Sequence, residues 1–419
     1  MCCMQSSDSA QILVTGLGVT TAIGQGKSDF IAALLKGQSN FGVMKRPGRQ
    51  YPPRAQETTC SRFLGAEIPS LSVPDVVPPN LLRTASLSGK VALATLHEAW
   101  NDAGLAQVDP TRIGLIVGGS NFQQRELAQT HDAYRERKRF LRPTYGLSFM
   151  DSDVCGMCAE VFGIQGLAYT VGGASASGQL AIVQAIHAVE SGQVDVCIGM
   201  GALMDLSSWE CQAFRSLGAM GSDTFAQEPS LACRPFDKRR DGFIFGESCG
   251  AVAIEKASTA RRDRVEPYAR ITGWALRMDA NRNPNPSVDG EVSAIHQALH
   301  KAGLRAKDID YINPHGTGSP LGDETELRAF TRCGLESAYI NSTKSLVGHG
   351  LSAAGAVETI ATLLQMKARQ LHPSGNLEDP IDTRYNWVRH RSVQHTITRA
   401  LKMSMGFGGI NSAMCMERI

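Results

Sequence analysis

One candidate for chemistry is a histidine in a segment rich in small, turn-forming residues. His315 lies in NPHGTGSPLGDETE, residues 313–326, and is followed directly by Gly, Thr317 and Gly. Small neighbours leave the imidazole open to a cavity. A lone histidine is more often a core residue, but these turn residues and the acidic pair Asp323 and Glu326 favour a functional site.

Two segments further along the chain carry more candidate groups. Residues 341–355 read NSTKSLVGHGLSAAG, so Lys344 and His349 flank a short apolar turn before a helix of small residues. Residues 405–411 read MGFGGIN, where glycines on both sides of Phe407 permit unusual backbone angles and close approach. The Phe407 amide is therefore a candidate donor to an oxyanion.

A serine in the first half stands where a nucleophile would be displayed. Residues 169–179 read YTVGGASASGQ, a strand that runs through glycines into a helix. Such a turn exposes the side chain of Ser175 and directs helix N–H groups toward it. Capping of the helix explains one of the serines Ser175 and Ser177, but it does not explain the whole GGASASG segment.

The elements that position these residues alternate between strand and helix, which indicates an α/β fold with buried sheets. The expected strands cover residues 11–19, 113–119 and 194–201, and the expected helices cover residues 88–104 and 176–190. Residues 44–80 show little periodicity and are rich in Pro, Arg and Ser, so they are interpreted as a long surface excursion.

An internal repeat indicates two related halves. Three pairs of segments match in the same order: ILVTG with ARITG, ASASGQLAI with LSAAGAVET, and FGESCGAVAIEK with FGGINSAMCMER. The repeat predicts an N-terminal half over residues 1–256 and a C-terminal half over residues 257–419. Two such halves pack most simply as one compact body.

Composition narrows the class of protein. The 419 residues include 42 basic and 40 acidic side chains, a net charge of +2, whereas dedicated nucleic-acid binders show a strong basic excess. No secretory signal and no run approaching ~18 apolar residues is visible. Cys155 and Cys158 form a lone C-x-x-C that is interpreted as structural, so no metal site is predicted. We expect a cytoplasmic enzyme without nucleic-acid or membrane partners.

The motifs HGTG, STKSLVGH and GFGG, in this order, together resemble those of the β-ketoacyl synthases, the condensing enzymes of fatty-acid and polyketide synthesis. RPFDKRRDGFIFGES at residues 234–248 and ILVTGLGVT near the start add to the resemblance, which covers nearly the whole chain. It implies the thiolase fold, a duplicated βαβαβαββ unit in five αβαβα layers. It also implies a homodimer that binds no cofactor itself, with substrates carried on the phosphopantetheine arm of an acyl carrier protein.

The resemblance also implies roles for the candidate residues. His315 and His349 match the two family histidines that act on malonyl groups. Lys344 matches the family lysine, and Glu326 matches the acid expected to pair with it. Phe407 matches the gatekeeper beside the nucleophile, and its N–H and that of the nucleophile would form the oxyanion hole.

Position 175 departs from the family pattern. Condensing members carry Cys there, in a pattern like TACSSG, whereas this chain has Ser175 in GGASASG. A helix N-terminus and a nearby histidine can draw a thiol to thiolate, but a serine hydroxyl is far less acidic and needs an adjacent base. Acyl transfer to this site, and with it condensation, is expected to be lost.

A site with both histidines and no thiol is expected to decarboxylate malonyl-carrier protein to acetyl-carrier protein and CO₂. The chain resembles the free-standing Ser-for-Cys family members found with polyketide β-branching cassettes. Two alternatives stay open: a non-catalytic partner like a chain-length factor, and an acyltransferase that uses Ser175 with His315 or His349 as base. The basic segment RERKRFLRP at residues 135–143 is a candidate docking site for the malonyl-loaded carrier protein.

Overall fold

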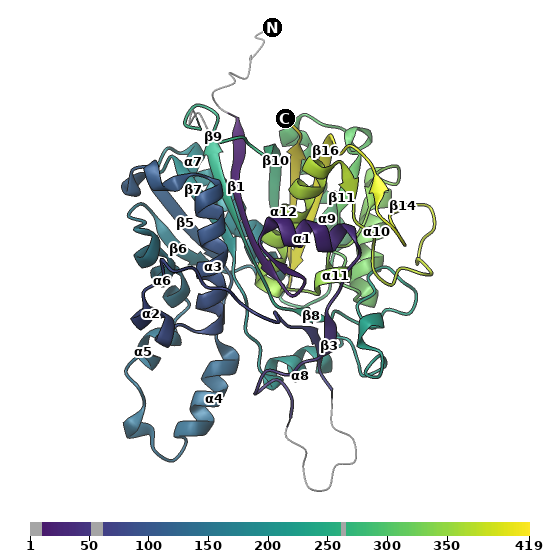
Figure 1. Cartoon of the computed structure of the whole chain (residues 1–419). Coiled ribbons are helices and arrows are strands. Elements are labelled where there is room, and N and C mark those ends of the chain that lie inside the picture. The colour runs from purple at the N-terminus through teal and green to yellow at the C-terminus, as the bar shows by residue number, and fades with distance from the viewer. Residues whose placement is uncertain (1–10, 52–61, 261–264) are drawn as a thin grey trace.

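The computed structural model describes residues 11–51, 62–260 and 265–419 as a mixed α/β structure (Figure 1). The elements of the first half are β1 (Ile12–Thr21), β2 (Gly24–Gln25), α1 (Lys27–Leu35), β3 (Phe41–Val43), β4 (Leu64–Ala66), α2 (Pro79–Thr84), α3 (Leu87–Asp102), β5 (Ile113–Gly118), α4 (Gln124–Tyr134), α5 (Tyr145–Ser148), α6 (Ser152–Phe162), β6 (Ala168–Val171), α7 (Ser177–Glu190), β7 (Val196–Gly201), α8 (Ser208–Ser216), β8 (Phe245–Gly246) and β9 (Ser248–Lys256). Those of the second half are β10 (Ala269–Met278), α9 (Val288–Ala302), β11 (Tyr311–Asn313), α10 (Pro320–Cys333), β12 (Tyr339–Ile340), α11 (Lys344–Val347), α12 (Ala354–Ala368), β13 (Gln370–Leu371), β14 (Asn386–Trp387), β15 (Val393–Gln394), β16 (Arg399–Gly406) and β17 (Ile410–Glu417).

The large sheet has the same strand order on both sides of its centre. It runs β14-β12-β11-β16-β17-β10-β1-β9-β7-β5-β6, so β1, β9, β7, β5 and β6 are mirrored by β10, β17, β16, β11 and β12. Among the described strands, the two sides are joined where β1 and β10 pair, at Ile12–Val14 and Ala269–Ile271. In Figure 1 the first side, purple to teal, lies on the left and the second, green to yellow, on the right.

Helices fill the space between the two sides and cover both outer faces. α7 packs on β5 and β7, α12 packs on β9 and β16, and the two helices contact each other in the middle layer. α3 and α6 cover the first side, whereas α9 covers β10 and β17 and contacts α10 on the second. The result is the five-layer αβαβα arrangement of the thiolase fold that the motifs implied.

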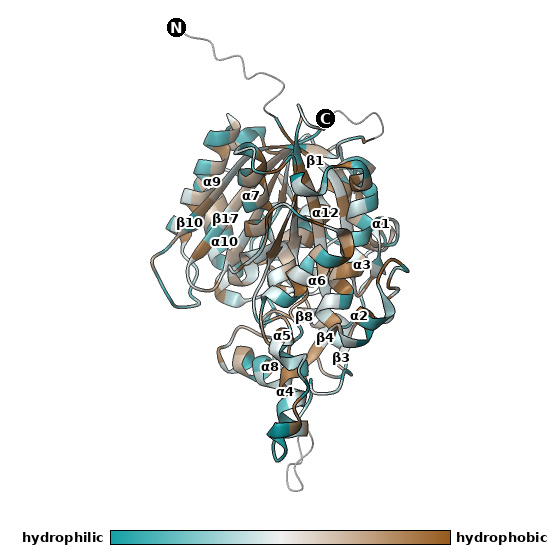
Figure 2. Ribbon diagram, turned by 90° about the vertical axis from the view of Figure 1, so that its left-hand side faces the viewer, coloured by the Kyte–Doolittle hydropathy of each residue, from teal (hydrophilic) through white to brown (hydrophobic). Residues whose placement is uncertain are grey.

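Alternation of side chains along the strands separates the core into layers. Val252 and Ile254 of β9 point into the cluster around α7 and α12, whereas Ala251 and Ala253 point into the cluster under α3 and α6. Such alternation is the period of two expected of a strand buried on both faces. Figure 2 shows the hydrophobic residues gathered on the inner strands and helices, with α4 largely hydrophilic.

The repeated segments occupy matching places in this architecture. ILVTG and ARITG fall in β1 and β10, and ASASGQLAI and LSAAGAVET begin α7 and α12. The small residues of these helix starts serve close packing, because a Cβ on Gly355 would lie 2.6 Å from the backbone nitrogen of Gln179. The boundary between the halves near residue 257 stays a prediction.

Residues 44–80 are not the surface excursion that their composition indicated, within the part that the structure describes. Arg49, Phe63 and Leu64 are buried, and β4 pairs with β3 and β8 in a small sheet. The Arg49 guanidinium forms ion pairs with Asp205 at 2.8 Å and Glu247 at 2.7 Å. These partners are far away in the sequence, so local composition could not reveal that the arginine is buried. Residues 52–61 of this stretch lie outside the described residues.

Across the described residues, no helix is both long and apolar enough to cross a bilayer.

Candidate active site

Ser175 lies on the sharp turn between β6 and α7. The turn is the short 3-10 helix Ala174–Ala176, and Ala174 has a φ of 47°, a conformation sparsely populated by non-glycine residues. Ser177 stabilises this turn, because its hydroxyl donates to the Ala174 carbonyl at 2.6 Å and accepts from the Gly173 N–H at 2.9 Å. Ser177 therefore satisfies the backbone of the turn, which leaves the Ser175 hydroxyl for the cavity.

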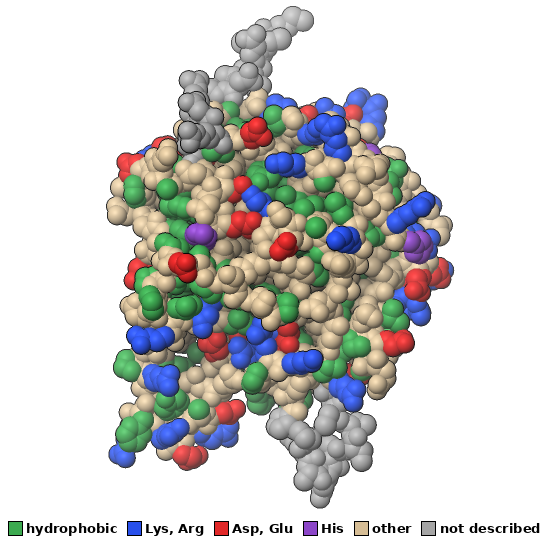
Figure 3. Space-filling view, in the orientation of Figure 1, with side chains coloured by type: hydrophobic (Ala, Val, Ile, Leu, Met, Phe, Trp, Pro, Cys, Tyr) green, Lys and Arg blue, Asp and Glu red, His purple; other side chains and the backbone are tan. Residues whose placement is uncertain are grey.

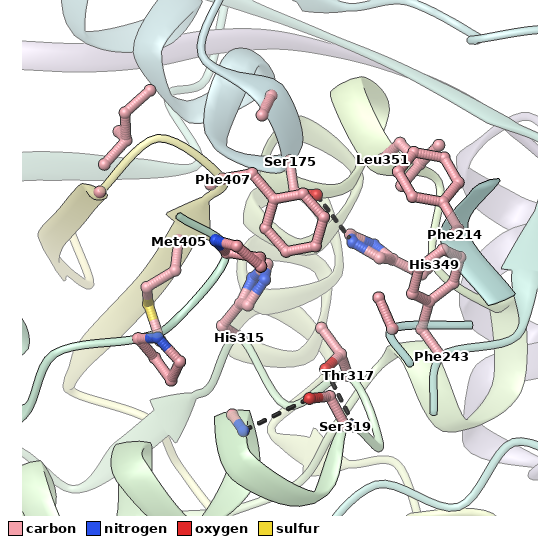
Figure 4. Close-up of a pocket in the computed structure, with 18 of the residues that line it drawn as sticks. Ser175, Phe214, Phe243, His315, Thr317, Ser319, His349, Leu351, Met405 and Phe407 are labelled. Carbon is pink, nitrogen blue, oxygen red and sulfur yellow. Dashed lines mark hydrogen bonds between the residues drawn. The ribbon is translucent and has the colours of Figure 1, made fainter. Parts of the chain in front are cut away.

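His349 reaches Ser175 from the other half of the chain. Its Nε2 lies 2.9 Å from Ser175 Oγ (Figure 4). The backbone of His349 is fixed beside β8, since its N–H donates to the Ile244 carbonyl and its carbonyl accepts from the Gly246 N–H. Its ring also meets the Phe243 ring edge to face, with 5.2 Å between centroids.

His315 is fixed by the loop that follows β11. Glu326 Oε1 accepts from the His315 N–H at 2.6 Å, and Oε2 accepts from the Gly316 N–H at 2.8 Å. Asp323 accepts the next two backbone N–H groups, those of Thr317 and Gly318, at 3.1 Å each. The acidic pair on α10 therefore shapes the HGTG loop and places the His315 ring 5.5 Å from that of His349.

The expected pairing of Lys344 with Glu326 is wrong. The Lys344 ammonium forms its ion pair with Glu358 on α12, and it also donates to the His315 carbonyl. Glu326 is already occupied by backbone N–H groups, and burial raises the pKa of its carboxyl to about 7. Lys344 and Glu358 are both 1% exposed, so each buried charge is stabilised by the other and would be unpaired without it.

The hydrogen-bond partners define the tautomers of both rings. Lys344 Nζ lies 3.5 Å from His315 Nδ1, and an ammonium can only donate, so this Nδ1 is the acceptor and Nε2 carries the proton. His349 Nδ1 is buried without a partner. A buried N–H without an acceptor is rarer than an unused lone pair, so its proton also lies on Nε2, toward Ser175.

Both imidazoles are held neutral. Burial, followed by the positive charges of Lys344 and Lys402, lowers the pKa of His349 well below its usual 6.5. The pKa of His315 is lowered well below 6.5 by burial first, then by Lys344, His349 and Lys402. At neutral pH the site thus presents two neutral rings, each with an Nε2–H available for donation.

These groups surround a cavity of about 230 Å³. Ser175, His315, His349, Thr317 and Phe407 line it, as Figure 4 shows. The apolar part of the wall is formed by Met204, Phe214, Phe243, Leu351 and Met405. Among the described residues that line this cavity, none is a cysteine. The site thus unites the predicted serine and histidines while offering no thiol to accept an acyl group.

Phe407 lies at the turn between β16 and β17, beside the Ser175 turn. It is 39% exposed, and its ring centroid is 6.3 Å from that of Phe214. The preceding Gly406 permits this closeness, because a Cβ there would lie 2.3 Å from the Gly173 carbonyl oxygen. This placement suits a gatekeeper; the role of its N–H in an oxyanion hole stays a prediction.

Sequence reasoning missed Glu358, Lys402 and the aromatic wall formed by Phe214 and Phe243. A signal for Lys402 was present, since one lysine lies inside the apolar run of a core strand, RALKMSMG. Glu358 follows Lys344 by 14 residues on a different helix, a spacing that predicts no contact. The two phenylalanines belong to segments that converge only in the folded chain.

The basic segment at residues 135–143 lies on an exposed projection formed by α4, α5 and the turn between them. Figure 3 shows Lys, Arg and hydrophobic side chains together on this projection, at the lower left. Phe140, at 61% exposed, is among the apolar residues there. None of the segment lines the cavity, and its binding of a carrier protein stays a prediction.

Within the described ranges, no group of three or more His, Cys, Asp or Glu side chains is placed to hold a metal ion.

Comparison with known proteins identifies the family. The model of the β-ketoacyl synthase N-terminal domain matches residues 9–260, and that of the C-terminal domain matches residues 268–378. The chain belongs to the β-ketoacyl synthase family. The cavity draws on both matched domains, because Ser175 lies in the first and His315 and His349 lie in the second.

Individual relatives span almost the whole chain. The polyketide biosynthesis malonyl-ACP decarboxylase PksF of Bacillus subtilis (strain 168) is 58% identical over 416 residues, covering 99% of this chain and 98% of its own length. The 3-oxoacyl-[acyl-carrier-protein] synthase 2 of Coxiella burnetii is 28% identical over 98% of this chain and 99% of its own. A crystal structure of a β-ketoacyl synthase from Burkholderia phymatum superposes with a TM-score of 0.87, at 27% identity, over 98% of this chain and 99% of its own.

The tautomers give the first test of this site. We expect His315 and His349 to remain neutral and protonated on Nε2 at pH 6.5, because burial and nearby ammonium groups disfavour the imidazolium. Nitrogen-15 spectra of histidine-labelled protein distinguish these forms, and His315→Ala and His349→Ala assign the signals. Titration of either ring near pH 6.5, or a proton on Nδ1, would contradict this assignment.

Proposed function

We propose that this β-ketoacyl synthase decarboxylates a malonyl group carried on an acyl carrier protein, giving acetyl-carrier protein and CO₂. The observation that carries the proposal is the cavity itself, in which two neutral Nε2–H donors face a serine where condensing members have a cysteine. The 58% identity to a malonyl-ACP decarboxylase supports the same conclusion.

The reaction breaks the bond between the malonyl C2 and its carboxylate. The carboxylate leaves as CO₂, and the electron pair of the broken bond passes into an enolate whose negative charge lies on the thioester oxygen. Nε2–H of His315 and of His349 donate to that oxygen, and such donors stabilise the transition state more than the neutral thioester. A proton from solvent then adds to C2 and completes the acetyl group.

Condensation fails at its first step. It requires an acyl group on the residue at position 175, and the Ser175 hydroxyl is neither acidic nor activated by a complete triad. His349 Nε2 lies 2.9 Å from Ser175 Oγ, but in the assigned tautomer it already carries a proton and cannot accept that of the hydroxyl. Its Nδ1 also has no carboxylate partner to orient the ring and stabilise an imidazolium. Without a bound acyl acceptor, the enolate is protonated.

The same Ser175–His349 contact favours an acyltransferase as a second candidate, with Ser175 as nucleophile. A stable acyl-enzyme mapped to Ser175 would support it. The retained histidines, in turn, weigh against a non-catalytic partner like a chain-length factor, because such a partner needs no donors directed into a cavity.

The substrate is presented on the phosphopantetheine arm of the carrier protein, and the chain itself needs no further cofactor for this reaction. The cavity suits a thioester arm because Thr317, Ser319, Asn283 and Asn285 line it together with its apolar wall. These side chains can bond the amides of the arm while the thioester oxygen lies between the histidines. The acetyl units supply the β-branching step of polyketide synthesis.

The direct test is incubation of the purified chain with malonyl-carrier protein, followed by intact-mass spectrometry of both proteins. We expect the carrier to lose one CO₂ and become acetyl-carrier protein, with no mass added to the enzyme. An unchanged carrier would refute the decarboxylase and favour the non-catalytic partner.

Single substitutions separate the roles of the three polar groups. His315→Ala and His349→Ala should each lower kcat for decarboxylation by roughly 10²–10³, the usual cost of a lost oxyanion donor. Ser175→Ala should keep most of the activity, because no acyl-serine forms. Stopped-assay rates near wild type for both histidine variants would contradict the electrostatic mechanism, and loss of activity in Ser175→Ala would give the hydroxyl a role.

We propose that the chain forms a homodimer through an open edge of its large sheet. β6 is the last strand of the large sheet, it pairs only with β5 within the described chain, and Tyr169 on it is 42% exposed. An unpaired edge strand is a ready surface for a second copy of the same strand. Sedimentation velocity should give twice the chain mass, and a particle of 45.0 kDa would contradict the dimer.

A further inference from the structure

A second buried lysine, Lys402, completes a group of three charges behind the histidines. Its Nζ lies 2.7 Å from Glu358 Oε2 and 3.0 Å from Ser404 Oγ, and it also donates to the Met403 carbonyl. Lys402 is 0% exposed and projects from the core strand β16. A fully buried ammonium is uncommon unless it is paired, so this lysine is held at a specific place.

The three charges do not cancel. Glu358 binds Lys344 through Oε1 and Lys402 through Oε2, so one carboxylate lies between two ammonium groups and the set carries one excess positive charge. Lys344 in turn touches His315. A Lys344–Glu358 pair alone would be neutral, so the second lysine makes the net charge of the set positive.

We propose that Lys402 is a positioning residue of the decarboxylation site, whose charge, shared through Glu358, keeps His315 and His349 as neutral Nε2–H donors. It acts through Glu358 and Lys344, and it does not line the cavity itself. This inference rests on the proposed decarboxylation and adds a residue that sets the protonation state of its donors.

The surroundings of the two rings support this assignment. Lys402 and Lys344 both contribute to the lowered pKa of His315 and of His349, after burial. The acidic groups nearby are Glu358 on α12, Glu326 and Asp323 on α10, and Asp279, which follows β10 and lines the same cavity. Burial raises the pKa of Asp323 to about 6 and that of Glu326 to about 7, which limits the negative charge that could offset the lysines.

A carboxylate between two ammonium groups also fixes geometry. Lys402 forms its ion pair with Oε2, whereas Oε1 accepts from Lys344, whose other two donors reach the His315 carbonyl and Nδ1. An ammonium has three N–H groups, so all three have acceptors. Lys402 therefore contributes to the His315 tautomer as well as to its charge.

Two substitutions with opposite effects on the charge test the proposal. Lys402→Met removes one positive charge, so protonation of the rings becomes easier and their pKa rises. The acid limb of kcat/KM for decarboxylation should move to higher pH by about one unit, roughly a tenfold loss of rate on that limb. Glu358→Gln removes the negative charge, and its acid limb should move to lower pH.

A matched control and a second readout separate this role from a structural one. Lys367→Met removes an exposed lysine from the same helix as Glu358 and should leave the profile unchanged. Nitrogen-15 titration of labelled histidines should show higher ring pKa values in Lys402→Met, whether or not the chain decarboxylates malonyl-carrier protein, so failure of the proposed function is distinguishable. The proposal is overturned if the ring pKa values and the acid limb of Lys402→Met coincide with those of the wild type. It is also overturned if Lys402→Met and Glu358→Gln both lower the rate without moving the acid limb. If Lys402→Met does not fold, Glu358→Gln decides alone, and an acid limb that stays or moves to higher pH overturns the proposal.

Discussion

Two imidazoles that must donate hydrogen bonds lie beside buried ammonium groups, and the chemistry of the whole cavity depends on this placement. An ammonium next to a ring disfavours the imidazolium, and burial acts in the same direction. The rings therefore remain neutral, and the positions of their partners leave the proton of each ring on Nε2. Glu358 stabilises this arrangement in the core, because it pairs with both ammonium groups. Without Glu358 the two buried charges would be unpaired and would repel each other.

The fold supplies each member of this site from a different segment of the chain. Ser175 comes from the start of α7 in the first half, whereas His349 precedes α12 and His315 follows β11 in the second. The two helices meet in the middle layer, so the serine and His349 come within 2.9 Å although 174 residues separate them. Under the proposed function, a hydroxyl in place of a thiol at position 175 removes acyl capture and leaves this framework in place, so that the site decarboxylates instead of condensing.

Motifs predicted the residues of the cavity better than their partners. Ser175, His315, His349, Thr317 and Phe407 were all found from short segments, because glycines and small residues must flank a side chain that faces a substrate. The α/β alternation and the repeat likewise predicted the duplicated fold, because the hydrophobic periodicity of helices and strands can be recognised within short segments. The boundary of the halves and the dimer depend on information that these segments do not contain.

The features that the sequence did not predict are contacts between residues far apart in the chain. The resemblance pairs Lys344 with Glu326, but the carboxylate beside Lys344 belongs to Glu358 on α12. Glu326 accepts hydrogen bonds from the HGTG backbone instead. The burial of Arg49 depends on Asp205 and Glu247, about 150 and 200 residues away, and no local pattern encodes such a pair. These buried ion pairs could not be predicted from composition or from local sequence patterns.

In the proposed reaction, the enolate is protonated because no acyl group is bound at position 175. This protonation is tested most directly by carrying out the reaction in D₂O with malonyl-carrier protein and an acyl-carrier protein offered together as a possible acceptor. Mass spectrometry of the carrier-bound product should show acetyl groups that contain one solvent-derived deuterium, with no extended chain. A β-ketoacyl product, formed by a new carbon–carbon bond to the offered acyl group, would contradict the account.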